Sequence, residues 1–301
     1  MRSVGPRRYT PELALIAVTV AYGATFKIVQ DALVDVTPVG YMLLRFGVAA
    51  AVLLPFAIVR GWRRPDVPDA SRRAFVYGVA LFGVVGFLGY LFQNLGLEKT
   101  STSNSAFITG LLVVFTPLIE TVVTHRRPPS NVLIAVGVAV IGLWFISGGT
   151  YRLGAGDAWT LACAFMFGAW MVLGGRLTLR FDAIALTAYQ VAILALLSVP
   201  VVVVDGMGDI TGQVIFAALL TGTVCSAGAF SLQLWGQRYI EPSRAAVILQ
   251  FEPIVAGVVG FWVGERLGWM GYVGAVIILA GIVIAESSTW RHREGLDRTV
   301  K

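Results

Sequence analysis

Long apolar runs separated by short polar stretches dominate the chain. A helix that crosses a bilayer needs about 20 mainly apolar residues, and the sequence offers ten such runs. They cover residues 12–31, 38–59, 74–97, 102–124, 130–147, 157–175, 183–204, 213–237, 243–264 and 268–286. The pattern predicts an all-α membrane protein with ten transmembrane helices. The first run follows a basic stretch, as in a signal peptide, but it is too long and lacks an A-x-A cleavage pattern, so we expect an uncleaved span.

The composition excludes a water-soluble domain. Hydrophobic residues make up 57% of the chain and charged residues 13%, whereas a soluble domain carries roughly a quarter of charged residues. Cys163 and Cys225 lie inside apolar runs without C-x-x-C spacing, and His125 and His292 lie in polar segments near helix ends. This distribution does not fit a metal site or a histidine-based catalytic triad. We therefore expect no cofactor and no bound metal.

Arginine and lysine concentrate in alternate loops. Of the 23 basic residues, 18 fall on the side of the N-terminus, three fall on the opposite side, and Lys27 and Arg45 lie within spans. The positive-inside rule then predicts a multi-pass protein of the cell membrane with both termini in the cytoplasm, including basic tails at residues 1–9 and 288–301. Because the basic residues are scattered and not gathered into one aromatic-interleaved patch, we expect no nucleic-acid partner.

The chain contains an internal repeat. At a shift of 140 residues, Gln93 of "YLFQNLGLEKTSTSNSAF" falls on Gln233 of "FSLQLWGQRYIEPSRAAV". At a shift of 136, "FTPLIETVV" matches "FEPIVAGVV", which pairs Pro117 with Pro253. Each copy contains five spans, and an odd number of spans inverts the second copy relative to the first. Inverted repeats around a midplane site are a recurring design of secondary transporters.

Four stretches resemble the EamA type of the drug/metabolite transporter superfamily. They are "YGATFKIVQDAL", "TPVGYMLLRF", "TSTSNSAFITGLLVVFTPL" and "EPSRAAVILQFEPIVAGVVGFWVGERL". The resemblance implies one EamA-like repeat at residues 10–148 and a second at 156–287, packed as two inverted five-helix bundles around a central cavity. It also implies export of amino acids or related metabolites without ATP. The sequence departs from the family pattern at two places that bear on substrate choice. Span 1 carries Lys27 where the family more often has an apolar residue, and the first half ends in "HRRPP" where a sequence like Gly264, Glu265 and Arg266 is expected.

Polar stripes on the predicted helices mark surfaces turned away from lipid. At about 100° per residue, one arc of span 4 carries Thr102, Ser105, Thr109, Thr116 and Glu120. The repeat partners, spans 3 and 8, each carry a similar face, with Gly86, Tyr90, Gln93 and Asn94 on one and Thr223, Ser226, Phe230, Gln233 and Gln237 on the other. These faces either line a hydrated cavity or hold helices together by hydrogen bonds.

Amides beside aromatic rings suit zwitterionic or aromatic metabolites, because amides bind the polar head and rings cover the apolar part. The cavity candidates are Tyr22, Tyr90, Gln93, Asn94, Thr109, Thr116, Trp170, Phe230, Gln233 and Gln237. Trp170 shares a stripe of span 6 with Trp159, Cys163 and Met166, which ordinary packing and interfacial anchoring also explain.

Four ionisable residues are candidates for coupling or charge pairing. Glu252 lies near mid-depth of span 9, stacked on the small residues Ala256, Gly260 and Gly264, and is expected to be protonated or paired with a cation such as Arg45. It either couples a proton, binds a substrate amine, or supports the backbone at Pro253. Glu120 is the second acidic candidate. Arg45 can instead bond helix-end carbonyls, and Lys27 can pair with Asp31 one turn away.

The expected function is a secondary transporter, most simply an exporter, of small polar metabolites by alternating access. A channel and a membrane-embedded enzyme are the alternatives. The loops lack the hydrophilic cluster that membrane enzymes need, and the sequence has no G-x-x-x-x-G-K-[ST] motif for ATP hydrolysis. The expected partners are a small-molecule substrate, the lipid bilayer and, as a candidate coupling ion, protons. Monomer and homodimer both remain open.

Overall fold

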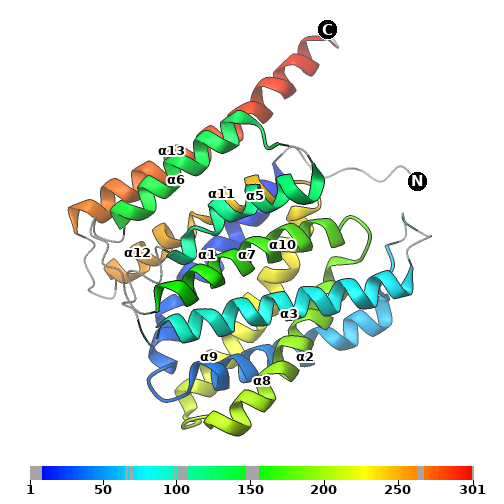
Figure 1. Cartoon of the computed structure of the whole chain (residues 1–301), viewed down its shortest axis with the longest axis vertical. Coiled ribbons are helices and arrows are strands. Elements are labelled where there is room, and N and C mark those ends of the chain that lie inside the picture. The colour runs from blue at the N-terminus through cyan, green and yellow to red at the C-terminus, as the bar shows by residue number, and fades with distance from the viewer. Residues whose placement is uncertain are drawn as a thin grey trace.

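The computed structural model describes residues 9–64, 67, 71–97, 99, 108–125, 127–146, 156–262 and 268–299. They form a bundle of helices (Figure 1). The helices of the first half are α1 (Thr10–Ala32), α2 (Pro38–Arg60), α3 (Arg72–Leu97), α5 (Leu112–Thr124) and α6 (Ser130–Ile146). Those of the second half are α7 (Asp157–Leu177), α8 (Ala183–Asp205), α9 (Gly212–Thr221), the π-helix η1 (Gly222–Ala229), α10 (Phe230–Gln237), α11 (Pro242–Leu249), α12 (Glu252–Trp262) and α13 (Trp269–Thr299).

Among the described residues, six helical segments are long and apolar enough to cross a membrane. They are Thr10–Ala32, Pro38–Arg60, Arg72–Gly96, Asp157–Leu177, Ala183–Asp205 and Gly212–Gln237. Three more segments, at Ile108–Thr124, Ser130–Phe145 and Trp269–Ala285, are apolar but shorter. The span expected at 243–264 is divided into α11 and α12, because Pro253 has no backbone N–H with which to continue the helix. A crossing number of ten therefore stays a prediction.

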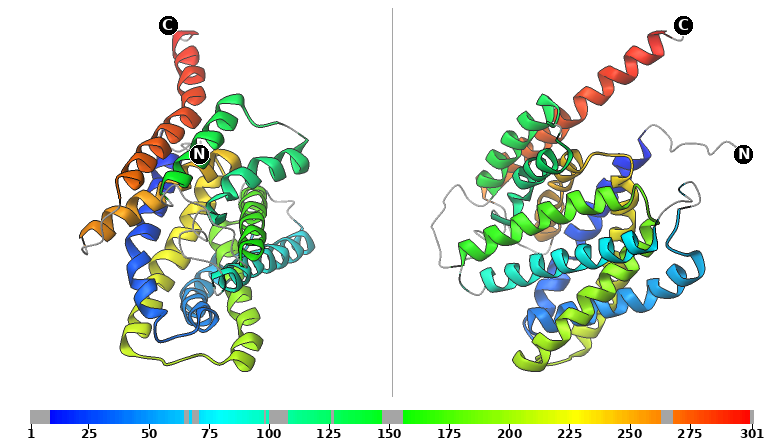
Figure 2. Two further views of the ribbon diagram at one scale, coloured as in Figure 1. Left: turned by 60° about the vertical axis from the view of Figure 1, so that its left-hand side comes forward. Right: turned by 45° about the vertical axis from the view of Figure 1, so that its right-hand side comes forward.

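The helices pack in three main pairs. α6 lies along α13 at one edge of the bundle, α3 lies along α7, and α2 lies along α8 (Figures 1 and 2). The largest apolar core fills the space between α2, α3, α8 and α10 and centres on the fully buried Phe46 and Phe82. A second core joins α6, α11 and α13 around Ala246 and Ile248. The C-terminal part of α13 projects beyond the other helices (Figure 2).

α2 and α8 are antiparallel, and at each end of the pair a backbone bridge connects the residues that flank the two helices. Backbone bridges pair Val36, before α2, with Gly208, after α8, and pair Arg63, after α2, with Phe181, before α8. The two helices correspond at a constant offset of 145 residues, and both end at a glycine, Gly61 with φ +80° and Gly206 with φ +83°. Residues with side chains rarely adopt this conformation. The same local structure thus occurs once in each half of the chain.

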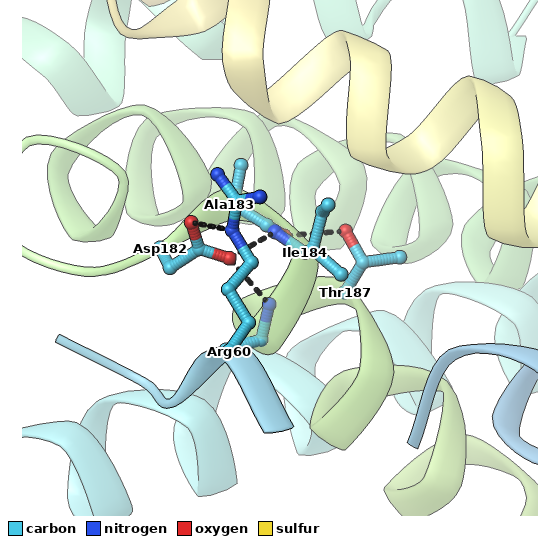
Figure 3. Close-up of polar contacts among 6 residues, drawn as sticks. Arg60, Asp182, Ala183, Ile184 and Thr187 are labelled. Carbon is cyan, nitrogen blue, oxygen red and sulfur yellow. Dashed lines mark hydrogen bonds and ion pairs between the residues drawn. The ribbon is translucent and has the colours of Figure 1, made fainter. Parts of the chain in front are cut away.

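Asp182 holds the start of α8 and links it to α2. Its Oδ1 accepts hydrogen bonds from the backbone N–H groups of Ile184 and Ala185 at 3.0 and 3.1 Å, and its Oδ2 lies 3.1 Å from Nε of Arg60 (Figure 3). The carboxylate therefore satisfies helix N–H groups that have no partner within the helix. The Arg60 side chain is 62% exposed, so water screens this ion pair.

Changing Asp182 to alanine is expected to destabilise the protein by about 1 kcal/mol, the usual effect of losing an N-cap side chain. Melting of the detergent-solubilised protein measures the change. Arg60→Ala is the matched control and should cost less than about 0.5 kcal/mol, since an exposed ion pair contributes little. Equal losses in the two variants would contradict the capping role and assign the effect to the ion pair.

Candidate functional site

Arg45 on α2 is held against the π-helix η1. Its Nε donates a hydrogen bond of 2.7 Å to Oγ of Ser226, and its guanidinium carbon lies 5.6 Å from the centre of the Phe46 ring. The approach depends on Gly222, because a Cβ at this residue would lie only 2.8 Å from the Arg45 carbonyl oxygen. The absence of a side chain lets α2 and η1 come close enough to fix the cation between them.

Glu252 lies at the start of α12 and is partly exposed. It interacts electrostatically with Arg45, and both charges act on the phenols of Tyr22 and Tyr90. These four residues come from α1, α2, α3 and α12. The site therefore contains a cation, a carboxyl group and two phenols that lie far apart in the sequence.

Five aromatic rings form a connected aromatic cluster: Tyr22, Phe46, Tyr90, Trp170 and Phe230. Phe230 lies 6.0 Å from Tyr22, 6.3 Å from Phe46 and 5.5 Å from Trp170, between ring centres. Tyr90 lies 5.3 Å from Phe46. Edge-to-face and tilted contacts of this kind are favourable for aromatic pairs. Tyr22, Tyr90 and Trp170 are partly exposed, whereas Phe46 and Phe230 are buried.

Two predicted glutamines on α10, Gln233 and Gln237, lie beside this cluster, and both amide nitrogens have a methionine sulfur as their partner. Oε1 of Gln233 accepts a hydrogen bond of 3.2 Å from the Tyr22 hydroxyl, and Nε2 of Gln233 lies 3.3 Å from the Met171 sulfur. Nε2 of Gln237 lies 3.2 Å from the same sulfur. A thioether is a weak acceptor. These amide N–H groups therefore lose little if a stronger acceptor replaces the sulfur.

Asn94 repeats this arrangement on α3, with Nδ2 placed 3.4 Å from the Met42 sulfur. Gln93 and Asn94 are both partly exposed. Ring contacts, a hydrogen bond and electrostatic interactions thus link seven predicted residues: Tyr22, Arg45, Tyr90, Trp170, Phe230, Gln233 and Glu252. It also places amide groups of α3 and α10 against methionines of α2 and α7.

Other predicted residues have local partners. Both the hydroxyl and the backbone N–H of Ser243 donate to the Glu120 carboxylate, so Glu120 joins α5 to the first turn of α11. Lys27 forms the predicted ion pair with Asp31. The hydroxyl of Thr116 is buried and donates to the Leu112 carbonyl, a bond within one helix.

Thr109 is partly exposed, with its hydroxyl 4.0 Å from the Cys163 sulfur. The polar stripe predicted for span 4 therefore divides into a partly exposed part at Thr109 and structural contacts further along the helix. Thr102, Ser105 and Gly264 lie outside the described residues, and so does the side chain of Ala256.

The prediction that Thr223 shares a face with Ser226 is wrong. Thr223 is exposed, and its hydroxyl donates to the carbonyls of Leu219 and Leu220 in the preceding turn, whereas Ser226 is buried against Arg45. Both residues belong to η1, where hydrogen bonds run from i to i+5 and the rotation per residue is smaller than in an α-helix. A wheel drawn at 100° per residue therefore misplaces them.

The predicted polar stripes do not include Phe46, Met171 or Gln190. Phe46 and Met171 are apolar, and nothing in an apolar run distinguishes a site residue from a packing residue. Gln190 is a polar residue inside an apolar span and could have been found by this signal alone. Its side chain is fully buried on α8.

Comparison with known proteins identifies the family. A sequence profile of the EamA-like transporter family matches the chain twice, at residues 10–148 and 154–286. The chain belongs to the EamA-like transporter family. This finding confirms the resemblance to EamA-type members of the drug/metabolite transporter superfamily. The protein is therefore a transporter, and its apolar helices agree with a multi-pass membrane protein.

Individual relatives support the same assignment. An uncharacterized transporter of Archaeoglobus fulgidus is 32% identical over 286 residues, which cover 93% of this chain and 87% of the relative. A probable terminal-alkyne amino-acid exporter of Streptantibioticus cattleyicolor is 25% identical, covering 93% and 94% of the two chains. A protein of known crystal structure aligns at a TM-score of 0.78 with 16% identity, over 94% of this chain and 99% of its own. The last comparison shows a shared fold.

Proposed function

We propose that this EamA-family transporter is a secondary carrier that exports amino acids or related small metabolites by alternating access. The observation that carries the proposal is the placement of two ionisable groups, Arg45 and Glu252, which interact electrostatically beside the aromatic cluster. Charged side chains inside a membrane protein are costly and mark substrate or ion pathways. A cation that is already oriented by Ser226 suits a substrate carboxylate.

Each part of an amino acid has a matching group in the site. Arg45 binds the carboxylate, the amide oxygen of Gln233 and the phenol of Tyr22 accept from the ammonium group, and the rings of the aromatic cluster cover an apolar side chain. Glu252 then remains available to carry a coupling proton. The amino-acid exporter among the relatives supports this substrate class.

The proposal includes ten helices in two inverted halves. The two matches to the family profile support it, as does the correspondence of α2 with α8 at their caps and flanking bridges. The packing partners also exchange between halves: α3 packs on α7 as α10 packs on α1, and α5 packs on α7 as α12 packs on α1. Such exchange is expected if one half repeats the other upside down.

Uptake and counterflow in proteoliposomes test the proposal directly. We expect the purified protein to exchange at least one member of a panel of amino acids and related metabolites across the membrane, without ATP. Protein-free liposomes are the control. Flux that does not saturate with substrate concentration, or that carries inorganic ions instead, would favour a channel and contradict the carrier mechanism.

Reporter fusions test the topology. With an even number of spans and the basic loops inside, fusions after Met1 and after Lys301 are both expected to report a cytoplasmic location. A fusion between residues 147 and 156, which joins the two halves, is the matched control and should report the opposite side. An external C-terminus would exclude the even span count.

Cysteine labelling tests which residues line the pathway. After Cys163 and Cys225 are replaced by alanine, we expect Tyr90→Cys and Thr109→Cys to react with membrane-impermeant thiol reagents, because both positions are partly exposed. Substrate should slow both reactions. Gln233→Cys is buried in this conformation and is expected to react only when the carrier cycles. Inertness of all three positions in resting and cycling protein would contradict the cavity assignment.

A further inference from the structure

α8 carries a buried amide without a hydrogen-bond partner among the described residues. The side chain of Gln190 is 0% exposed, and within the described part of the chain neither its Nε2 nor its Oε1 has a hydrogen-bond partner. An unpaired buried polar group costs about 1–3 kcal/mol, and native proteins satisfy the large majority of such groups. An amide that leaves both its donor and its acceptor unpaired in the apolar core therefore calls for a ligand.

A second unpaired group lies beside this amide. Nε1 of Trp170, on α7, is also buried and has no partner in the residues that the structure describes. Both side chains converge on Gly86 of α3: a Cβ built there would lie 3.3 Å from Nε1 of Trp170 and 3.5 Å from Nε2 of Gln190. Two unpaired nitrogens, from α7 and α8, thus lie against the same glycine of α3.

Trp170 connects this place to the candidate site. Its ring stacks on Phe82, with centres 5.3 Å apart and planes inclined by 9°, and lies 5.5 Å from the centre of Phe230. The indole is partly exposed although its nitrogen is buried. One part of Trp170 therefore belongs to the aromatic cluster, and its N–H faces Gln190 and Gly86.

The chemistry of these groups defines what they can bind. Trp170 Nε1 and Gln190 Nε2 require an acceptor, whereas Gln190 Oε1 requires a donor. The three converging residues are uncharged, and an isolated ion would be strongly disfavoured among them. A hydroxyl group or a carboxamide both donates and accepts, so either can satisfy all of these atoms. A carboxylate would leave the Gln190 oxygen without a donor.

We propose that Gln190, Trp170 and Gly86 form a polar subsite that binds a hydroxyl or carboxamide group at the end of the substrate side chain. The inference rests on the proposed transport of amino acids and adds a preference among them. A water molecule offers the same hydrogen-bonding chemistry, so the experiments must separate a substrate group from water.

Competition in proteoliposome counterflow makes this separation with pairs of similar shape: tyrosine against phenylalanine, asparagine against leucine, and glutamine against methionine. We expect the unmodified protein to prefer the polar member of at least one pair by about tenfold. Gln190→Leu should bring this ratio close to one, with the apolar member affected by less than about twofold. Trp170→Phe, which keeps a ring but removes the N–H, should also lower the ratio.

Thr187→Val is the matched control, since Thr187 is buried one turn earlier on α8 and bonds only within its helix, to the Ala183 carbonyl. It should keep the preference. Equal competition by both members of every pair, or a preference that survives in Gln190→Leu, would overturn the subsite and leave water as the occupant.

A second measurement does not depend on amino-acid transport. Thermal-shift titrations compare p-cresol with toluene, which differ by one hydroxyl group, on the detergent-solubilised protein. We expect p-cresol to raise the melting temperature of the unmodified protein more than toluene, and we expect this difference to vanish in Gln190→Leu. If no amino acid is transported in proteoliposomes but this difference is observed, the subsite is supported and the proposed function is contradicted. Equal shifts in the unmodified protein would overturn the subsite.

Discussion

Replacing Arg45 with methionine is expected to weaken substrate binding by about 100-fold in a protein that still reaches the membrane folded. Arg45 is the cation that we assign to the substrate carboxylate, and a hydrogen bond to a charged group contributes about 1.5–3 kcal/mol, of which the upper end corresponds to roughly 100-fold in affinity. Methionine keeps a long side chain of low polarity. The measurement is the half-saturation concentration for counterflow in proteoliposomes.

Two further variants separate charge from geometry. Arg45→Lys keeps the charge but loses the planar fork and the Nε–H that donates to Ser226, so we expect an intermediate loss. Ser226→Ala removes only the group that orients Arg45 and should cost about tenfold or less. Methionine at position 45 with unchanged affinity and a normal melting temperature would exclude the guanidinium from substrate binding.

Glu252→Gln is expected to abolish accumulation driven by a pH gradient and to leave counterflow largely intact. Glutamine keeps the shape and the hydrogen-bonding capacity of the side chain but cannot gain or lose a proton, so a carrier that couples through Glu252 becomes an exchanger. Uptake into proteoliposomes with and without an imposed pH gradient measures accumulation, and counterflow at equal pH measures exchange.

Glu120→Gln is the matched control, because Glu120 is bonded to Ser243 at the start of α11 and lies away from the aromatic cluster. We expect it to lower the melting temperature and to preserve the gradient dependence. Gradient-driven accumulation that persists in Glu252→Gln would remove the coupling role. Loss of counterflow with a normal melting curve would instead assign Glu252 to the substrate amine, and loss of folded protein would assign it to support of the backbone at Pro253.

Much of the helical framework could be predicted from the sequence, because apolar runs of sufficient length leave a chain in lipid few alternatives to helix. The predicted ends of the α2 and α8 segments differ from the observed ones by a single residue. The Pro253 signal likewise coincides with the division between α11 and α12. Hydropathy did not predict η1, because π- and α-helical turns can be built from the same apolar residues.

The candidate site was predicted less completely, for a physical reason. Charged and amide side chains in apolar spans stand out, so Arg45, Glu252 and Gln233 could be selected from the sequence. Which of them approach one another depends on how α1, α2, η1 and α12 pack, and the approach of α2 to η1 depends on the small residue Gly222. Glu120, like Glu252, is a carboxylate within an apolar span, yet it accepts hydrogen bonds from the backbone N–H and the hydroxyl of Ser243.

The π-helix η1 also sets the rotational phase of α10. Each of its turns holds more residues than an α-helical turn, so the segment Gly222–Ala229 contains about one surplus residue and rotates by roughly 100° less than an α-helix of the same length. Phe230 and Gln233 follow directly, and their direction toward Tyr22 depends on this surplus. The number of residues in η1 therefore determines the direction in which the Gln233 amide and the Phe230 ring point. Inserting one residue into α9 would turn both away from Tyr22 without changing any side chain in the site, whereas deleting one residue from η1 would let this segment wind as an α-helix and keep the phase of α10.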